Sequence, residues 1–148
     1  MQKKSVILLW LLIAAALLCA CGGGRSTGQP AETISVRTAK ETIADNQKRE
    51  VCVSGYPVAF FLSYTYTGAK MYNVYFSDRA EDYFGSIEAS EEISDEWLEV
   101  ICKEKDPLWK SMREIFEGEQ ATEQYRILLK GTKSRVSGCY YDFVDFAE

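Results

Sequence analysis

The sequence contains no histidine, and this absence excludes several kinds of active site. Histidine is the usual general base near neutral pH and the commonest metal ligand, and Ser-His-Asp and Cys-His arrangements require it. The chain also has no C-x-x-C pair and no D-x-D-x-D-G run, which removes the usual zinc, thioredoxin-like and calcium-loop patterns. We therefore expect a protein that is not an enzyme, with no catalytic residue, no metal ligand and no cofactor.

Basic residues are in deficit. The chain has 17 Lys and Arg against 22 Asp and Glu, which gives a net charge of −5. Proteins that bind nucleic acid need a track of cations for the phosphates, so this balance disfavours nucleic acid as a partner. The excess acid is concentrated in residues 78–106, where a solvated surface is one interpretation and a site for a basic partner or a divalent cation is the other.

No apolar run reaches the roughly 20 residues that a membrane-spanning helix needs. The longest run, residues 6–18, follows Lys3 and Lys4 and is closed by glycines from Gly22 onward. A short apolar segment after a positive start, with a small residue before a cut, is typical of a secretory signal peptide. We therefore expect the rest of the chain to work outside the cytoplasm.

The end of this segment, Leu18-Cys19-Ala20-Cys21, resembles the lipobox of bacterial lipoproteins. The resemblance implies that residues 1–20 are removed and that Cys21 becomes the lipidated N-terminus, anchored to the bacterial cell membrane or envelope. Two acyl chains hold a protein stably at a membrane, whereas one holds it only marginally. The alternatives are an ordinary signal peptide cut near Ala20, or a retained anchor, with Cys21 an unmodified thiol.

Residues 21–34 carry the modified cysteine and a spacer rich in Gly, Ser, Thr and Pro, which predicts a flexible linker. Residues 35–148 then have the length of one domain. Three cysteines remain in it, Cys52, Cys102 and Cys139. An exported protein can oxidise one pair, or all three can stay as thiols.

Alternation of apolar and polar residues predicts strands in the first half of the domain. Residues 49–62 form a long strand with a bend at residues 55–57, and residues 71–77 and 83–89 form the second and third strands. Ahead of them, Thr38-Ala39-Lys40-Glu41 has the T-x-x-E form of a capping box, which predicts a short helix to about Asn46.

Helical spacing replaces the alternation after the third strand. Apolar residues at i, i+4, i+7 and i+8 between Ile93 and Ile101 predict one helix. A second helix is predicted from Pro107, with Asp106 as its N-cap, until Gly118 ends it. Residues 125–130 and 139–146 alternate again and predict the fourth and fifth strands.

This order is that of an OB-fold: a mainly β, five-stranded Greek-key barrel with its helices between strands three and four. Two stretches carry a further resemblance, Ala44 to Gly55 (ADNQKREVCVSG) and Ile127 to Thr132 (ILLKGT). They are similar to the opening and the fourth strand of the tRNA_anti-like group of bacterial OB-fold proteins. The resemblance implies a fold, since the name of that group records structural kinship to anticodon-binding domains and no activity.

OB-folds bind ligands on the face of strands two and three, between the loops that join strands one to two and four to five. In this sequence the loops are residues 63–70 and 131–138. Aromatic and cationic side chains in this region make six candidate ligand-binding residues: Tyr64, Tyr66, Tyr75, Phe84, Lys133 and Arg135. The alternative is that the loop tyrosines cover the core and that the cations only solubilise the surface.

Two functions follow from these observations. The first is a membrane-tethered, non-catalytic binding module for an envelope protein, a peptide or a glycan. The second is an OB-fold nucleic-acid-binding protein or nuclease, which the charge and the expected location oppose.

Overall fold

The computed structural model describes residues 32–88, 91–134 and 138–148. The predicted lipidation site Cys21, the predicted signal peptide and residues 21–31 of the predicted linker lie outside the described residues. No helix in the described ranges combines the length and the apolar character that crossing a membrane would require.

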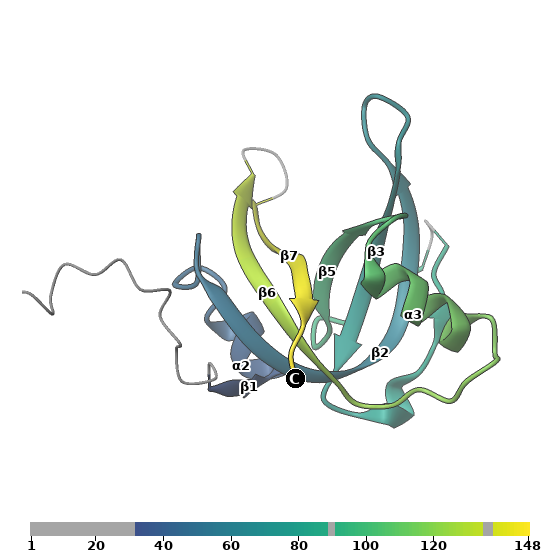
Figure 1. The fold of residues 1–148 in the computed structure, drawn as a ribbon, viewed down its shortest axis with the longest axis horizontal. Coiled ribbons are helices and arrows are strands. Elements are labelled where there is room, and N and C mark those ends of the chain that lie inside the picture. Colours follow the sequence, from purple (N-terminus) through teal and green to yellow (C-terminus); the bar gives the residue numbers. More distant parts are fainter. Residues whose placement is uncertain (1–31, 89–90, 135–137) are drawn as a thin grey trace, which may run out of the picture. The chain divides into compact units, whose positions relative to one another are not determined.

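Strands make up most of the regular secondary structure in the described residues (Figure 1). They are β1 (Thr33–Ser35), β2 (Glu50–Tyr64), β3 (Lys70–Ser77), β4 (Gly85–Ser86), β5 (Leu98–Lys103), β6 (Tyr125–Ser134) and β7 (Gly138–Phe146). The helical elements are α2 (Val36–Glu41), the short 3-10 turn η1 (Ala80–Asp82) and α3 (Pro107–Phe116). The prediction of a mainly β chain with few helices is confirmed.

Strand pairing follows the path β2-β3-β5-β7-β6, and β6 pairs again with β2. All of these pairings are antiparallel except that between β5 and β7, which is parallel. The ring of pairings is uneven, because β5 and β7 share only Val100↔Tyr141 and Ile101↔Asp142, whereas β2 and β3 pair from Tyr56↔Ser77 to Tyr64↔Lys70. The helix α3 lies between β5 and β6 in the chain, as predicted for the helical insertion.

Alternation along the strands sends one set of side chains into the main core. On β3 the buried set includes Tyr72 and Val74, and on β5 it includes Leu98 and Val100. The helix α3 covers this core with an apolar stripe at helical spacing, made of Leu108, Trp109, Met112 and Ile115. The prediction for this helix is confirmed, including Asp106 as the N-cap and Pro107 in the first turn.

The long first strand of the ring was also predicted correctly. Its bend coincides with a register shift between Pro57 and Ala59, where β2 pairs with β3. A bulge at this point lets the strand turn and reach different partners on either side. Residues 50–55 pair with β6, and residues 56–64 pair with β3.

The third strand of the ring was predicted wrongly. Residues 93–101 were assigned to a helix, but Leu98–Lys103 is the strand β5, and it pairs with β3 along its whole length. In the predicted segment 83–89, of which residues 83–88 are described, the described part contains only the short strand β4, which pairs with β2 in parallel. The buried residues Leu98, Val100 and Cys102 have a period of two, which fits a strand better than a helix.

The first helix begins earlier than the sequence predicted. Ser35 is its N-cap, and the hydroxyl of Ser35 accepts a hydrogen bond from the backbone N–H of Thr38 at 3.1 Å. The carboxylate of Asp78 accepts from the backbone N–H groups of Val36 and Arg37 at 2.8 and 3.1 Å. Thr38 is therefore inside the helix, and the predicted capping box and the extension to Asn46 are wrong.

The first four residues of the loop predicted at 131–138 belong to a strand instead, because β6 continues to Ser134. Gly131 allows a close approach here: a Cβ at this position would lie 2.2 Å from the backbone oxygen of Asn46. The backbone N–H of Lys48 donates to the carbonyl of Gly131 at 2.8 Å, and the N–H of Gly131 donates to the carbonyl of Arg49 at 3.1 Å.

The fully buried side chain of Tyr141 connects β7 to the segment after α2. Its hydroxyl donates to the carbonyl of Ala39 at 2.8 Å and accepts from the side-chain amide of Asn46 at 3.1 Å. The three cysteines in the described residues, Cys52, Cys102 and Cys139, are free thiols.

Candidate functional site

The outer face of β2, β3 and β5 carries a connected row of polar side chains. Ser63 Oγ lies 2.9 Å from Asn73 Oδ1 and donates to it. Asn73 Nδ2 and the hydroxyl of Tyr75 both donate to Glu99 Oε1, at 2.5 and 3.2 Å. These residues alternate with the core residues of the same strands, so the row faces away from the main core.

A pocket of about 410 Å³ lies at one end of this row. We call it the outer pocket, and its principal residues are Tyr75, Ile93, Trp97, Glu99 and Tyr140. Lys40, Asp95 and Cys139 also line it. The outer pocket therefore combines aromatic surfaces with a carboxylate whose position is fixed by two hydrogen-bond donors.

The chain between β3 and β5 forms one side of this pocket. The N–H groups of Phe84 and Ile87 donate to the carbonyls of Val58 and Phe60 on β2, at 2.7 and 2.8 Å. Val58, Ala59, Tyr75 and Ile87 then form a second buried cluster, separate from the main core. This cluster holds the connecting segment against the sheet.

Trp97 joins the aromatic residues on this face. Its ring centroid lies 6.3 Å from that of Tyr75 and 6.4 Å from that of Phe84. The ammonium group of Lys40 donates to the backbone carbonyls of Asp95 and Trp97, the second at 3.0 Å. The helix α2 thus helps to hold Trp97 in place.

The hydroxyl of Tyr75 stays protonated over the physiological pH range. Burial, and then the charge and the hydrogen bond of Glu99, raise the pKa of Tyr75 well above its ordinary value. A neutral phenol can donate to Glu99, whereas a phenolate would repel it. Glu99 consequently presents a carboxylate with one oxygen already engaged.

The predicted site residues separate into three places. Tyr75 and Phe84 come together on the outer face, with Phe84 53% exposed but Tyr75 only 4% exposed. Tyr64 and Tyr66 are exposed at the hairpin that joins β2 to β3. Lys133 is exposed near the end of β6, and Figure 1 shows that end of β6 well apart from the β2–β3 hairpin.

Arg135 lies outside the described residues. The sequence predicted that all six residues line one groove. The five that the structure describes lie in three separate places and do not form such a groove. Tyr64 and Tyr66 project into solvent, so the alternative that they cover the core is not supported either.

Of the five principal residues of the outer pocket, sequence reasoning identified only Tyr75 and missed Ile93, Trp97, Glu99 and Tyr140. The spacing from Ile93 to Ile101 had predicted a helix, so neither Trp97 nor Glu99 was assigned to the face of a strand. The alternation of Leu98, Val100 and Cys102 was the signal that would have placed Glu99 on the same face as Tyr75.

No group of acidic, cysteine or histidine side chains in the described residues is arranged to hold a metal ion. Comparison with models of protein families, with curated proteins and with solved structures gives no match.

Proposed function

We propose that this chain is an extracytoplasmic lipoprotein whose domain is a non-catalytic binding module of the OB-fold type. The module binds an envelope protein, a peptide or a glycan at the outer pocket. The observation that carries the proposal is the combination, in one pocket, of Trp97 and Tyr140 with the hydrogen-bonded carboxylate of Glu99.

The pairing order supports the OB-fold. With the ring strands numbered along the chain as β2, β3, β5, β6 and β7, the pairing path is first, second, third, fifth, fourth and back to first. A five-stranded Greek-key barrel of this type has its helix between the third and fourth strands, which is the position of α3.

The place of the outer pocket also supports this assignment. OB-folds bind their ligands on the face of the second and third strands. Tyr75 belongs to the second ring strand and Glu99 to the third, and both lie on the face opposite the main core. The ligand would then occupy the same face as in other members of the fold.

The chemistry of the pocket favours a ligand that donates hydrogen bonds or carries a positive charge. Glu99 accepts hydrogen bonds, and Asp95 adds a second carboxylate. Aromatic side chains bind the apolar faces of sugars and attract cations. Hydroxyl groups of a glycan or an ammonium or guanidinium group of a peptide satisfy these requirements, and phosphates do not.

The leader sequence supports the location. Lys3, Lys4 and the apolar residues after them match a secretory signal, and Leu18 to Cys21 match a lipobox. An anchor at Cys21 followed by a short flexible linker would hold the module close to the membrane surface.

Direct titration tests the binding proposal. The full chain is titrated at low salt with a lysine-containing peptide, a neutral oligosaccharide of the cell-wall type and single-stranded DNA. We expect the peptide or the oligosaccharide to bind, and the Glu99→Gln variant to weaken that binding about tenfold, which corresponds to about 1.4 kcal/mol.

Glu99→Gln is a suitable variant because the amide oxygen can still accept from Asn73 and Tyr75 while the charge is lost. The control is Glu50→Gln, an exposed acid on β2 that removes the same charge at a distance from the pocket. Failure of both the peptide and the oligosaccharide to bind, or DNA binding tighter than about millimolar, would contradict the proposal.

A further inference from the structure

A second cleft, distinct from the outer pocket, lies between α3 and the β2–β3 hairpin. Its volume is about 560 Å³. We call it the helix cleft, and it is lined by four aromatic residues and by charged residues at its edge: Phe60, Tyr72, Trp109, Phe116, Glu104, Lys105, Lys110, Arg113 and Glu117. None of the sequence patterns pointed to this arrangement.

The floor of the helix cleft is a group of aromatic rings in mutual contact. Tyr72 and Trp109 are stacked, with centroids 3.5 Å apart and an angle of 13° between the planes. Phe60 contacts Trp109 and Phe116, with centroids 5.1 and 4.8 Å apart. Such a floor suits a flat, apolar ligand body that can stack on it.

The floor continues along the hairpin beyond the end of α3. Leu62 pairs with Tyr72, and Phe60 pairs with Val74, so Phe60, Leu62 and Tyr64 share the face of β2 that points to the main core. Leu62 is 36% exposed and Tyr64 is 60% exposed. The helix therefore covers only part of this apolar row.

Two polar groups in the helix cleft lack a partner. Tyr72 is 6% exposed and Trp109 is 8% exposed, and neither the hydroxyl of Tyr72 nor the indole N–H of Trp109 has a hydrogen-bond partner in the described residues. Among the described residues, Gln47 Oε1 is the only fully buried side-chain N or O atom that lacks a hydrogen-bond partner. The Tyr72 hydroxyl and the Trp109 indole nitrogen also lack partners, so these two atoms cannot be fully buried and must contact solvent. A ligand acceptor in the cleft could therefore bind them.

The rim of the helix cleft is positive in a chain that is negative overall. Glu104 is within 3.6 Å of Lys70, and Glu117 is within 3.5 Å of Arg113, so both acids on the rim are paired. Lys105 and Lys110 are exposed and have no ion pair among the described residues. Two cations are thus available beside an aromatic floor.

From these observations we infer that the helix cleft is a binding site for a small organic anion with an aromatic body, an aryl carboxylate in particular. The ring system stacks on Trp109 and Phe60, and the carboxylate accepts from the free donors and pairs with Lys105 or Lys110. This ligand is negatively charged, whereas the ligand proposed for the outer pocket is neutral or positively charged, so the two sites can be tested separately.

A photoreactive aryl carboxylate, 4-benzoylbenzoate, tests the inference on the full chain. Irradiation with increasing probe is followed by mass spectrometry of the labelled peptides. We expect saturable labelling of peptides from α3 and from the β2–β3 hairpin, and at least about tenfold weaker half-saturation in the double variant Lys105→Gln and Lys110→Gln. Uncharged benzophenone should label these peptides weakly and without saturation.

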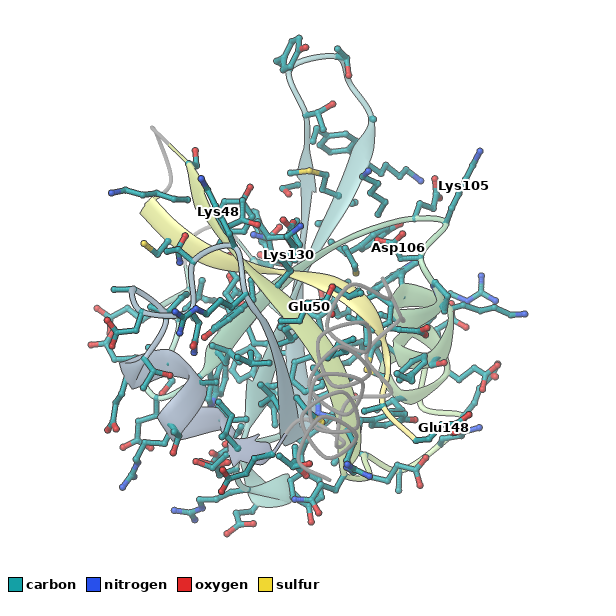
Figure 2. The ribbon with its side chains drawn as sticks, turned by 60° about the vertical axis from the view of Figure 1, so that its left-hand side comes forward. Lys48, Glu50, Lys105, Asp106, Lys130 and Glu148 are labelled. Atoms are coloured by element: carbon teal, nitrogen blue, oxygen red, sulfur yellow. The ribbon has the colours of Figure 1, made fainter. Side chains whose placement is uncertain are left out.

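The matched control is the double variant Lys48→Gln and Lys130→Gln. It removes the same charge from a different surface, and Figure 2 shows Lys48 and Lys130 near each other and away from Lys105. Half-saturation within about twofold of the unchanged chain is expected for it, and also for Glu99→Gln in the outer pocket.

Three results would overturn the inference. Equal, saturable labelling by benzophenone would show that the cleft has no preference for anions. An equal loss in both double variants would assign the effect to net charge alone. Labelling spread evenly over the chain would show that the probe has no site in the helix cleft.

Discussion

The hydroxyl of Tyr141 provides the sharpest test of how the ring is held to its N-terminal segment. Tyr141→Phe removes one oxygen from a side chain that is fully buried. That oxygen donates to the carbonyl of Ala39 and accepts from the amide of Asn46, so both partners lose a hydrogen bond inside the protein. Asn46 keeps its bond to the hydroxyl of Thr42 at 2.9 Å, whereas the carbonyl of Ala39 has no second hydrogen-bond donor in the described residues.

The expected loss in the free energy of unfolding follows from the unpaired carbonyl. Leaving a buried acceptor without a partner costs about 1–3 kcal/mol. Urea denaturation of the full chain, followed by tryptophan fluorescence, measures this loss as a lower midpoint with an unchanged slope.

Tyr140→Phe is the matched control. Tyr140 is next to Tyr141 in the chain, but its side chain is partly exposed and lines the outer pocket. We expect it to change the free energy of unfolding by less than about 0.5 kcal/mol. Equal losses in the two variants, or no loss in Tyr141→Phe, would refute the role given to this hydroxyl.

Four further predictions follow from the proposed lipid anchor and from the structure of the domain. Cys21→Ser should release the protein from membranes without unfolding it, and fractionation that finds no release would argue against lipidation. Ile115→Ala should cost about 2–5 kcal/mol because it leaves a cavity where α3 covers the core, and an unchanged urea midpoint would show that the helix packs loosely. Burial and a neighbouring carboxylate raise the pKa of Cys102 to about 12. Iodoacetamide at pH 8 should therefore modify the partly exposed Cys139 and spare Cys102 in the folded chain. Mass spectrometry that finds both thiols modified equally would contradict this burial. Burial and nearby carboxylates raise the pKa of Tyr125 to about 12. The contribution of Tyr125 to stability should therefore be complete below pH 10 and decline as the pH rises from 10 towards 12. Urea midpoints that stay constant across this range would refute the shift.

The elements that the sequence predicted well are those whose periodicity has one interpretation. The stretch that forms β3 is rich in aromatic residues, which favour strands, and α3 has an N-cap, a proline in its first turn and four buried residues on one face. The bend in β2 was marked by glycine and proline, and the structure has its register shift there.

The segment before β5 shows why the third strand could not be placed in the same way. Val100 fits both the helical series from Ile93 and the alternating series from Leu98. Pairing with β3 decides between them, and that partner lies far away in the chain. Local spacing cannot contain this information, because the strand is stabilised by tertiary contacts.

The same limit applies to the candidate sites. Alternation placed Tyr75 correctly on the face opposite the main core, but it could not show that the connecting segment covers that face and leaves Tyr75 buried. The helix cleft depends on contacts between α3 and β2, which no motif within either element records.

The many partners of β2 have a consequence for the time course of folding. This strand pairs with β1, β3, β4 and β6, which come from both ends of the described chain. Distant pairings of this kind form slowly, because chain entropy must be lost before they contribute. A nascent polypeptide that ends before β6 cannot complete the ring of pairings, because β6 is the strand that joins β2 to β7. The ring can therefore close only after the last strands of the chain have been synthesised.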